Sequence, residues 1–455
     1  MKRSTLSYKT ILFSGALATM AGIAAGNVTG RFGTAHAGDE SAAAVSYAIG
    51  DPLPGLDSET VALFAAGQAL FNHQFTATEG LGPIYNERAC STCHGAGAVG
   101  GGDPVGPGAT EFNVTHFGFD NQGFFDPMRD LGGLVIQHRT IHDTTNPDCP
   151  MLGESVPAVS NIQSRRNTPP VFGFGLLDAI PDSEILRRQG LGIDGVYGVA
   201  NWGIELQARD ATPVPGTPLS VWGPTRVGRF GWHAQTGTLF QFSTEPFNIE
   251  LGITTPFFPQ EFTPAGTRFA AQLPATCNVA QHAVNDFDSS MSVSLYHFQA
   301  LLAPPPALPK NQDAKAGEAL FNALGCELCH TSQMQTGDRY NLILADGTTK
   351  RVRQMENRIV HAYSDLLIHD MGLGLADDPS GATIGRVMGR ADGRHWRTTP
   401  LWGIRFKKAL LHDGRTDSIE SAILAHGGEG NNARNRFAGL GQRQRDQIVA
   451  FLNTL

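Results

Sequence analysis

Apolar residues recur at helical spacing in several segments of the chain and seldom alternate with polar residues. Residues 443–455 carry Ile448, Phe451 and Leu452 on one helical face, and residues 182–188 open a shorter helix with an acidic residue. The period of two that is typical of strands is rare. The pattern therefore predicts a mainly α fold with long loops and few short strands.

The N-terminal segment is patterned differently from the rest. Basic residues come first, an apolar run follows at residues 11–25, and Ala-His-Ala stands at residues 35–37. This order predicts a secretory signal peptide at residues 1–37 and an exported, periplasmic protein. No later run approaches the roughly 18 apolar residues that a spanning helix needs, so we expect no stable membrane insertion.

Charge excludes one class of partner. Residues 1–37 contain four basic residues and no acid, so their removal moves the net charge from −8 to −12. An acidic protein repels the phosphate backbone, and we therefore expect no binding to nucleic acid.

Two short motifs, CSTCH at residues 90–94 and CELCH at residues 326–330, have the spacing of covalent haem attachment. Each cysteine thiol adds to a haem vinyl group, and the adjacent histidine ligates the iron. A redox dithiol or a zinc site is the alternative for one such motif, but a weak one for two. The motifs predict two covalently bound haem c groups, held by Cys90, Cys93, His94, Cys326, Cys329 and His330.

Sequence similarity between two halves of the chain accompanies the motifs. The matching pairs, in chain order, are residues 65–72 with 315–322, 166–173 with 397–403 and, more weakly, 231–239 with 410–419. This order predicts an internal duplication of a cytochrome c-like domain. The proline-rich residues 301–310 form the predicted linker between an N-terminal domain with insertions, residues 38–300, and a C-terminal domain, residues 311–455.

The halves differ at the place of a second iron ligand. In the second half, His426 follows His412 by fourteen residues. Carried back through the repeat, that place falls near Phe247, and residues 243–253 contain neither histidine nor methionine. The nearest group there that can move a proton is Glu250.

This difference predicts two unequal haem groups. His330 and His426 would fill both axial positions of the second iron, which then passes electrons. The first iron would be open opposite His94, with Glu250 on its distal side as a proton-transfer group. A surface or helix-capping role is the alternative for Glu250.

Longer segments extend the similarity beyond the motifs. They are GLGPIYN at residues 80–86, PPVFGFGLLDAIP at 169–181, GRFGWHAQ at 228–235, ELGI at 250–253, YSDLLIHDMG at 363–372, HDGR at 412–415 and HGGE at 426–429. With these segments the chain resembles the di-haem oxidoreductase family, also described as thiol oxidoreductases, which is related to the bacterial di-haem cytochrome c peroxidases.

The resemblance implies roles for particular residues. Glu250 stands where the peroxidase relatives place a distal catalytic acid, and Gln241 resembles a glutamine that accompanies it. His426 stands where many of those relatives have a methionine, which implies a bis-histidine iron of lower potential. Met371 is the alternative ligand to the second iron. Trp232 either lies between the irons or packs in the core.

Other polar residues are candidates for contacts with haem or with an ion. Arginines can pair with propionates, histidines can bond propionates or loop backbone, and an acidic loop could hold calcium, as in the peroxidase relatives. These candidates are Arg229, Arg397, Arg415, His138, His142, His369, His412, Asp377 and Asp378.

Cys149 and Cys277 remain outside the two motifs. In an oxidising compartment, a disulfide between them is favoured over two free thiols.

The leading hypothesis is an enzyme. A soluble electron donor, such as a small cytochrome or copper protein, would reduce the second haem, and the first would reduce a small-molecule oxidant such as peroxide. A non-catalytic electron carrier and an oxygen-activating oxygenase resembling the di-haem rubber oxygenases are the alternatives. A thiol oxidoreductase ranks last, because it would need a reactive Cys149 or Cys277.

Overall fold

The computed structural model describes residues 47–103, 113–128, 131, 135–144, 147–204, 225–258, 275–277 and 289–455. The predicted signal peptide, residues 1–37, lies outside the described residues. Residues 47–455 form one compact unit by their contacts. Within the described ranges, no helix combines the length and apolar character that crossing a membrane requires.

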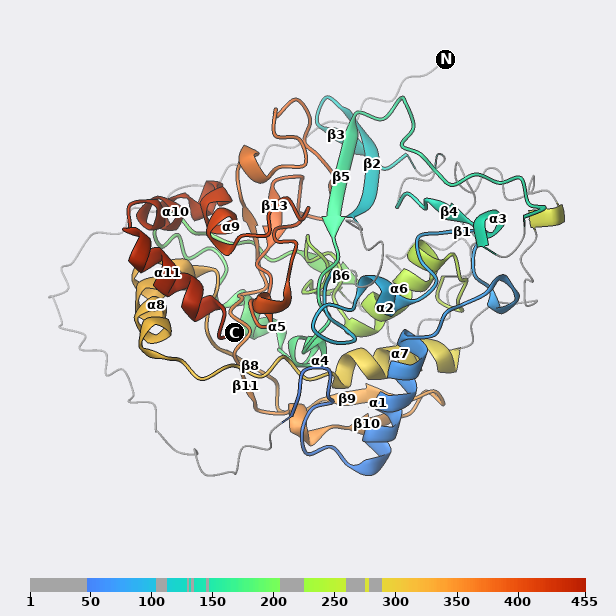
Figure 1. The fold of residues 1–455 in the computed structure, drawn as a ribbon, viewed down its shortest axis with the longest axis horizontal. Helices are drawn as coiled ribbons and strands as arrows, with labels where there is room; N and C mark the ends of the chain where they lie inside the picture. The colour runs from blue at the N-terminus through green and yellow to red at the C-terminus, as the bar shows by residue number, and fades with distance from the viewer. Residues whose placement is uncertain are drawn as a thin grey trace, which may run out of the picture. The chain divides into compact units, whose positions relative to one another are not determined.

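Helices of very different length are spread along the chain. They are α1 (Ser58–Phe71), α2 (Cys90–Cys93), α3 (Ile141–Thr144), α4 (Phe174–Asp178), α5 (Asp182–Leu186), α6 (Leu239–Leu251), α7 (Ser289–Leu301), α8 (Gln312–Ala323), α9 (Ile419–Ala425), α10 (Asn431–Ala438) and α11 (Gln442–Leu452) (Figure 1). Helices α5 and α11 confirm the predicted helices at residues 182–188 and 443–455.

The strands are short. They are β1 (Ile84–Tyr85), β2 (Asn113–Asn121), β3 (Phe124–Asp126), β4 (Arg139–Thr140), β5 (Ile162–Asn167), β6 (Trp202–Ile204), β7 (Thr225–Val227), β8 (Met334–Gln335), β9 (Asn341–Ile343), β10 (Thr349–Arg351), β11 (Ile359–Val360), β12 (Ile368–Asp370) and β13 (His395–Arg397). Strands β3, β2 and β5 form a three-stranded antiparallel sheet, and the others pair two by two. Helices joined by long loops and short strands agree with the predicted fold class.

Each half contains two long helices that cross at a glycine. Helix α1 packs against α7, and α8 packs against α11 (Figure 1). A Cβ atom at Gly67 would lie 2.1 Å from the carbonyl oxygen of Ser294, and one at Gly317 would lie 1.8 Å from that of Gln447. Both crossings therefore require glycine. The two attachment motifs follow α1 and α8, so each motif is placed by a similar helix pair.

The hydrophobic core does not divide between the halves. The larger core joins Phe64 and Phe298 of the first half to Leu342 and Met355 of the second. A smaller core around Phe451 belongs to the second half alone. Contacts between the halves therefore run through the larger core. The division into two domains stays a prediction.

Backbone hydrogen bonds also connect the halves. The amide of Asn167 donates to the carbonyl of His412 at 2.6 Å, and the amide of Arg397 donates to the carbonyl of Trp232 at 2.7 Å. The repeated segments at residues 166–173 and 397–403 thus each bond to the other half.

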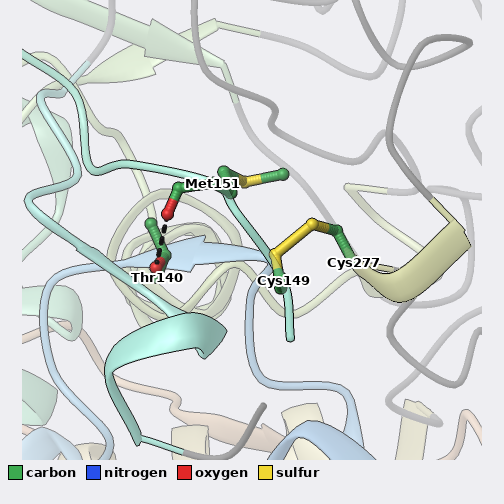
Figure 2. Close-up of a disulfide and its surroundings, with 4 residues drawn as sticks. All are labelled: Thr140, Cys149, Met151 and Cys277. Carbon is green, nitrogen blue, oxygen red and sulfur yellow. Dashed lines mark hydrogen bonds between the residues drawn. A yellow bond between two sulfur atoms is a disulfide. The ribbon is translucent and has the colours of Figure 1, made fainter. Parts of the chain in front are cut away.

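The two cysteines outside the motifs are joined by a disulfide. Cys149 and Cys277 are bonded, with their Cα atoms 4.8 Å apart, and both side chains are buried (Figure 2). Near them, the Thr140 hydroxyl donates to the carbonyl of Met151 at 3.1 Å. This confirms the favoured pairing.

Candidate haem-binding sites

The first attachment motif forms one helical turn at the edge of a large cavity. In α2 the amide of His94 donates to the carbonyl of Cys90 at 3.0 Å, which puts both side chains on one face. The cavity, about 1450 Å³ including the part open to solvent, is lined by Cys90, Cys93 and His94. We call it the first haem site.

The second motif repeats this arrangement on a 3₁₀ turn, η6 (Cys326–Leu328). The amide of His330 donates to the carbonyl of Cys326 at 3.0 Å. Its cavity, about 1350 Å³ including the part open to solvent, is lined by Cys326, Cys329 and His330. We call it the second haem site.

The donor atoms in both sites fit haem. The four motif cysteines are free thiols, although the chain forms a disulfide elsewhere. Burial lowers the pKa of both His94 and His330 to about 4, so each imidazole is neutral, which is the form that binds metal. Thiols beside a neutral imidazole, in a deep cavity, match the needs of an attached haem.

Of the four histidines that line the second haem site, His330 and His426 each have one ring nitrogen occupied by a backbone carbonyl. His330 Nδ1 lies 2.9 Å from the carbonyl oxygen of Tyr363, and His426 Nδ1 lies 2.8 Å from that of Ala422. These bonds leave Nε2 as the free nitrogen of both rings. Met371 lines the same cavity, so the structure brings both candidates for the second axial ligand to it.

Glu250 lies in the wall of the first haem site, at the end of α6. Burial raises its pKa to about 7, and a hydrogen bond from Asn86 Nδ2 to its Oε2, at 2.8 Å, opposes this rise. A carboxyl group with this pKa can both accept and return a proton near neutral pH.

Gln241 does not join Glu250 in the cavity. Its side chain is buried, but the α6 residues that line the first haem site are at positions 242, 243, 245, 246, 249, 250 and 251. Nine residues make two and a half helical turns, so Gln241 and Glu250 project from opposite sides of α6. The structure therefore corrects the expectation that the two side chains act together.

Helices α6 and α9 start in the same way. Before α6, Phe230 bridges Thr236 and Thr238 caps the helix. Before α9, Leu410 bridges Thr416 and Ser418 caps the helix.

This match places the two helix starts in a register that differs by one residue from the position predicted near Phe247. His426 is eight positions after the cap of α9, and Pro246 is eight positions after the cap of α6. The residue that corresponds to His426 is thus Pro246 rather than Phe247. Pro246 lines the first haem site, and a proline side chain cannot ligate iron.

Trp232 lies between the two sites, because it lines both cavities. Its indole Nε1 donates to the carbonyl of Asn167 at 2.8 Å. Its ring centre is 6.4 Å from that of His412, which stacks on Trp396 at 3.7 Å. A continuous aromatic path thus borders the second haem site and reaches the first.

The three arginines proposed for propionates have different environments. Arg397 is buried and lines the second haem site. Arg229 is fully buried away from both cavities and donates to backbone carbonyls and to Asp182. Arg415 pairs with Asp413 and donates to the carbonyl of Gly374. The expectation for Arg229 and Arg415 is therefore corrected: they hold loops, because carbonyls and carboxylates satisfy them.

The histidine candidates also separate. His369 and His412 line the second haem site, and His138 lines the first. His369 Nδ1 lies 2.8 Å from Glu429, and Nε2 lies 3.0 Å from Asp365. His142 is exposed.

The acidic loop is engaged by donors that compete with a cation. Asp377 is buried and accepts hydrogen bonds from Arg166 at 2.8 Å and from Ser164 at 2.6 Å. Asp378 accepts from Ser380 and Thr383. Calcium needs several free oxygen ligands, so these contacts do not support the predicted calcium at Asp377 and Asp378.

Several residues in the cavities were missed from the sequence. Glu245 and Met388 line the first haem site, and Arg434 lines the second with its Nε buried. Asn86 ends the GLGPIYN segment, which contributed to the family resemblance but gave Asn86 no role. Glu245, Met388 and Arg434 lie outside the motifs, and only folding brings them to a cavity.

Comparisons with known proteins identify a family for the chain. The family described as "Di-haem oxidoreductase, putative peroxidase" matches residues 159–455. The matched part contains Glu250, the second attachment motif and His426, and it starts after the first motif. Among curated proteins, no match was found.

Solved structures that resemble the chain share little sequence with it. Kuenenia stuttgartiensis hydrazine synthase is 13% identical over 89% of this chain and 90% of its own, with a TM-score of 0.37. The diheme peroxidase BthA from Burkholderia thailandensis is 14% identical over 87% and 86%, with a TM-score of 0.36. A MauG-like protein associated with microbial copper homeostasis is 13% identical over 90% and 94%, with a TM-score of 0.35.

The family match covers well over half of the chain and includes the second haem site with its attachment motif. The chain belongs to the di-haem oxidoreductase family.

Proposed function

We propose that the protein is an exported di-haem c-type cytochrome that reduces peroxide or a related small oxidant at the first haem site. Electrons would enter at the second haem site from a soluble cytochrome or copper protein in the periplasm. The observation that carries the proposal is Glu250, a partly buried carboxyl group with a pKa of about 7 in the wall of the cavity that Pro246 also lines.

The haem groups supply the irons that bind the oxidant and carry electrons. Thioether bonds to Cys90, Cys93, Cys326 and Cys329 would hold them, and His94 and His330 would each provide one axial nitrogen. The protein residues must then orient the oxidant, move protons and keep the two irons in different states.

Glu250 provides the proton transfer. Reduction of hydrogen peroxide to two water molecules consumes two electrons and two protons, and a proton must move from one peroxide oxygen to the other as the bond breaks. The Glu250 carboxylate can accept the first proton at Oε and return it, because its pKa is near neutral.

The repeated helix starts support unequal sites. Matching bridges, caps and glycine crossings in the two halves favour an internal duplication. In that alignment the second half has His426, with Nε2 free beside His330, and the first half has Pro246. We infer a bis-histidine iron in the second site and an open position in the first.

Trp232 supports electron transfer between the sites. It borders both cavities, and its position is held at Nε1 and at its backbone carbonyl. An aromatic side chain between the two sites shortens the distance that an electron must cross through empty space.

Replacement of Glu250 by glutamine tests the proposal. Glu250→Gln keeps the size of the side chain but removes its proton-transfer group, so peroxide turnover should fall by about 10²–10⁴-fold with both haem spectra unchanged. Gln241→Leu is the matched control on the opposite side of α6 and should retain turnover. Full turnover in Glu250→Gln would contradict the proposal.

A non-catalytic electron carrier is the second candidate, favoured by one observation. Met388 lines the first haem site and carries a sulfur atom that can ligate iron. The test is whether the first haem binds added ligands. If it binds none in the wild-type protein but binds them in Met388→Ala, the electron carrier becomes the preferred function.

A further inference from the structure

Asn86 makes two hydrogen bonds to one residue, Glu250. Its side-chain Nδ2 donates to Glu250 Oε2 at 2.8 Å, and its backbone amide donates to the carbonyl oxygen of Glu250 at 2.6 Å. Among the described residues, Asn86 is the one side chain that donates to this carboxylate.

The orientation of the Asn86 amide is fixed from its other side. The backbone amide of His138 donates to Asn86 Oδ1 at 3.1 Å. An amide oxygen accepts and an amide nitrogen donates, so this bond directs the NH₂ group to Glu250.

The backbone around Asn86 is packed tightly against α6. Asn86 directly follows β1, which pairs with β4, and the Gly82 amide donates to the carbonyl of Leu251 at 3.0 Å. At Gly252 a Cβ atom would lie 2.3 Å from the carbonyl oxygen of Ile84. The end of α6 and the segment before Asn86 therefore hold one relative position.

We propose that Asn86 is a positioning residue: it holds the Glu250 carboxylate at the wall of the first haem site and stabilises its ionised form. The inference rests on the proposed role of Glu250 in proton transfer. A donor to the ionised form favours that form, whereas burial favours the neutral acid. Asn86 thus keeps a partly buried carboxyl group available as a base.

Other charged or titratable groups near Glu250 do not provide such a donor. On α2 the two cysteines would become uncharged thioethers, and Glu87 is paired with Arg139 at 2.7 Å. The groups that share the neighbourhood are Cys90, Cys93, Glu87, Arg139, His138 and Glu245.

The test titrates the Glu250 carboxyl group directly in the full two-haem protein. Infrared difference spectra follow the carbonyl band of the protonated acid against pH, and Glu250→Gln assigns the band because it removes it. In Asn86→Leu, loss of the donor should raise the midpoint by about one pH unit or more. The acid limb of peroxide turnover should move by the same amount.

Gln137→Leu is the control for a merely structural role. Gln137 Nε2 donates to the carbonyl of Ile249 at 3.0 Å, so it supports the same end of α6 without contacting the carboxylate. Its midpoint should stay at the wild-type value. If Asn86→Leu does not fold, Asn86→Ala replaces it, because that side chain removes the donor and adds no second carboxyl group beside Glu250.

An unchanged midpoint in the Asn86 variants, or an equal shift in Gln137→Leu, would overturn the inference. The infrared titration does not depend on turnover. Loss of the proposed function would instead be seen as full peroxide turnover in Glu250→Gln, so the two failures can be told apart.

Discussion

Glu250 shows how one partly buried side chain defines the chemistry of a cavity. It lies outside the attachment motifs and makes no ion pair with another residue that the structure describes, yet burial brings its pKa to about 7 against the bond from Asn86. Few groups exchange protons readily at neutral pH. Its place beside Cys90 and Cys93 makes that property useful.

The first prediction concerns pH. The carboxylate is the form that accepts a proton from peroxide, and the raised pKa means that this form dominates only above about pH 7. The kcat/KM for peroxide should therefore rise with pH, pass its midpoint near 7 and level off above it. Stopped-flow measurement of peroxide reduction across pH 5–9 checks this. A profile that is flat on the acid side would contradict it, and Glu250→Gln should lose the limb.

Single residues divide clearly into those that the sequence predicted and those that it did not. The attachment motifs are local, so CSTCH and CELCH were enough to find both cavities. Gln241 was misplaced because the resemblance compares residue types and not their positions around a helix. Nine residues along α6 put Gln241 and Glu250 on opposite sides of the helix. Arg229 was misassigned because its carbonyl partners, Leu177 in α4 and Ile180 just after that helix, lie 52 and 49 positions away in the chain.

At the scale of elements, the two halves repeat one plan. A helix crossing at glycine precedes each motif, and a turn with a hydroxyl cap precedes each of α6 and α9. Sequence identity aligned His233 with His412. Backbone conformation instead aligns Gly231 with Leu411, both at positive φ of 78° and 70°.

That one-residue difference could not be predicted from the sequence. A leucine at positive φ carries no pattern of its own, because the left-handed conformation favours glycine and is rare for branched side chains. In the register set by the caps, Pro246 stands at the position of His426. The predicted difference between the two haem sites stays a prediction.

The second prediction tests the helix crossing beside the second haem site. Gly317→Ala would place a methyl group 1.8 Å from the carbonyl oxygen of Gln447, so α8 and α11 must separate. We expect a loss of about 1–3 kcal/mol in the free energy of unfolding. Denaturant unfolding of the haem-loaded protein measures it. Gly374→Ala, where a Cβ meets nothing within 4 Å, should be nearly neutral; equal losses in both would contradict the crossing.

At the scale of the whole molecule, the halves are connected at several levels. They share the larger core, exchange backbone hydrogen bonds and have Trp232 on both cavities. The predicted linker at residues 301–310 leads from α7 towards α8, but Leu302 and Ala303 at its start are buried. Sequence repeats indicated two units. The contacts that join these units lie between side chains far apart in the sequence, and a repeat pattern does not predict such contacts.

The third prediction concerns the disulfide. Cys149 and Cys277 are 128 residues apart, so their bond restricts a long loop of the unfolded chain. Replacing both with alanine should lower the free energy of unfolding by about 2–4 kcal/mol. Thermal unfolding measures the effect. A reductant should lower the melting temperature of wild type but leave that of the double variant unchanged; the opposite pattern would contradict a stabilising disulfide.

The proposed function requires two unequal haem sites, with an open iron only where Pro246 and Glu250 line the cavity. This inequality can be tested by titrating the reduced protein with carbon monoxide and the oxidised protein with cyanide, followed by optical spectroscopy. We expect one of the two haem groups to bind each ligand, and His426→Ala to let the second bind as well. Binding by neither haem, or by both, in the wild-type protein would contradict it.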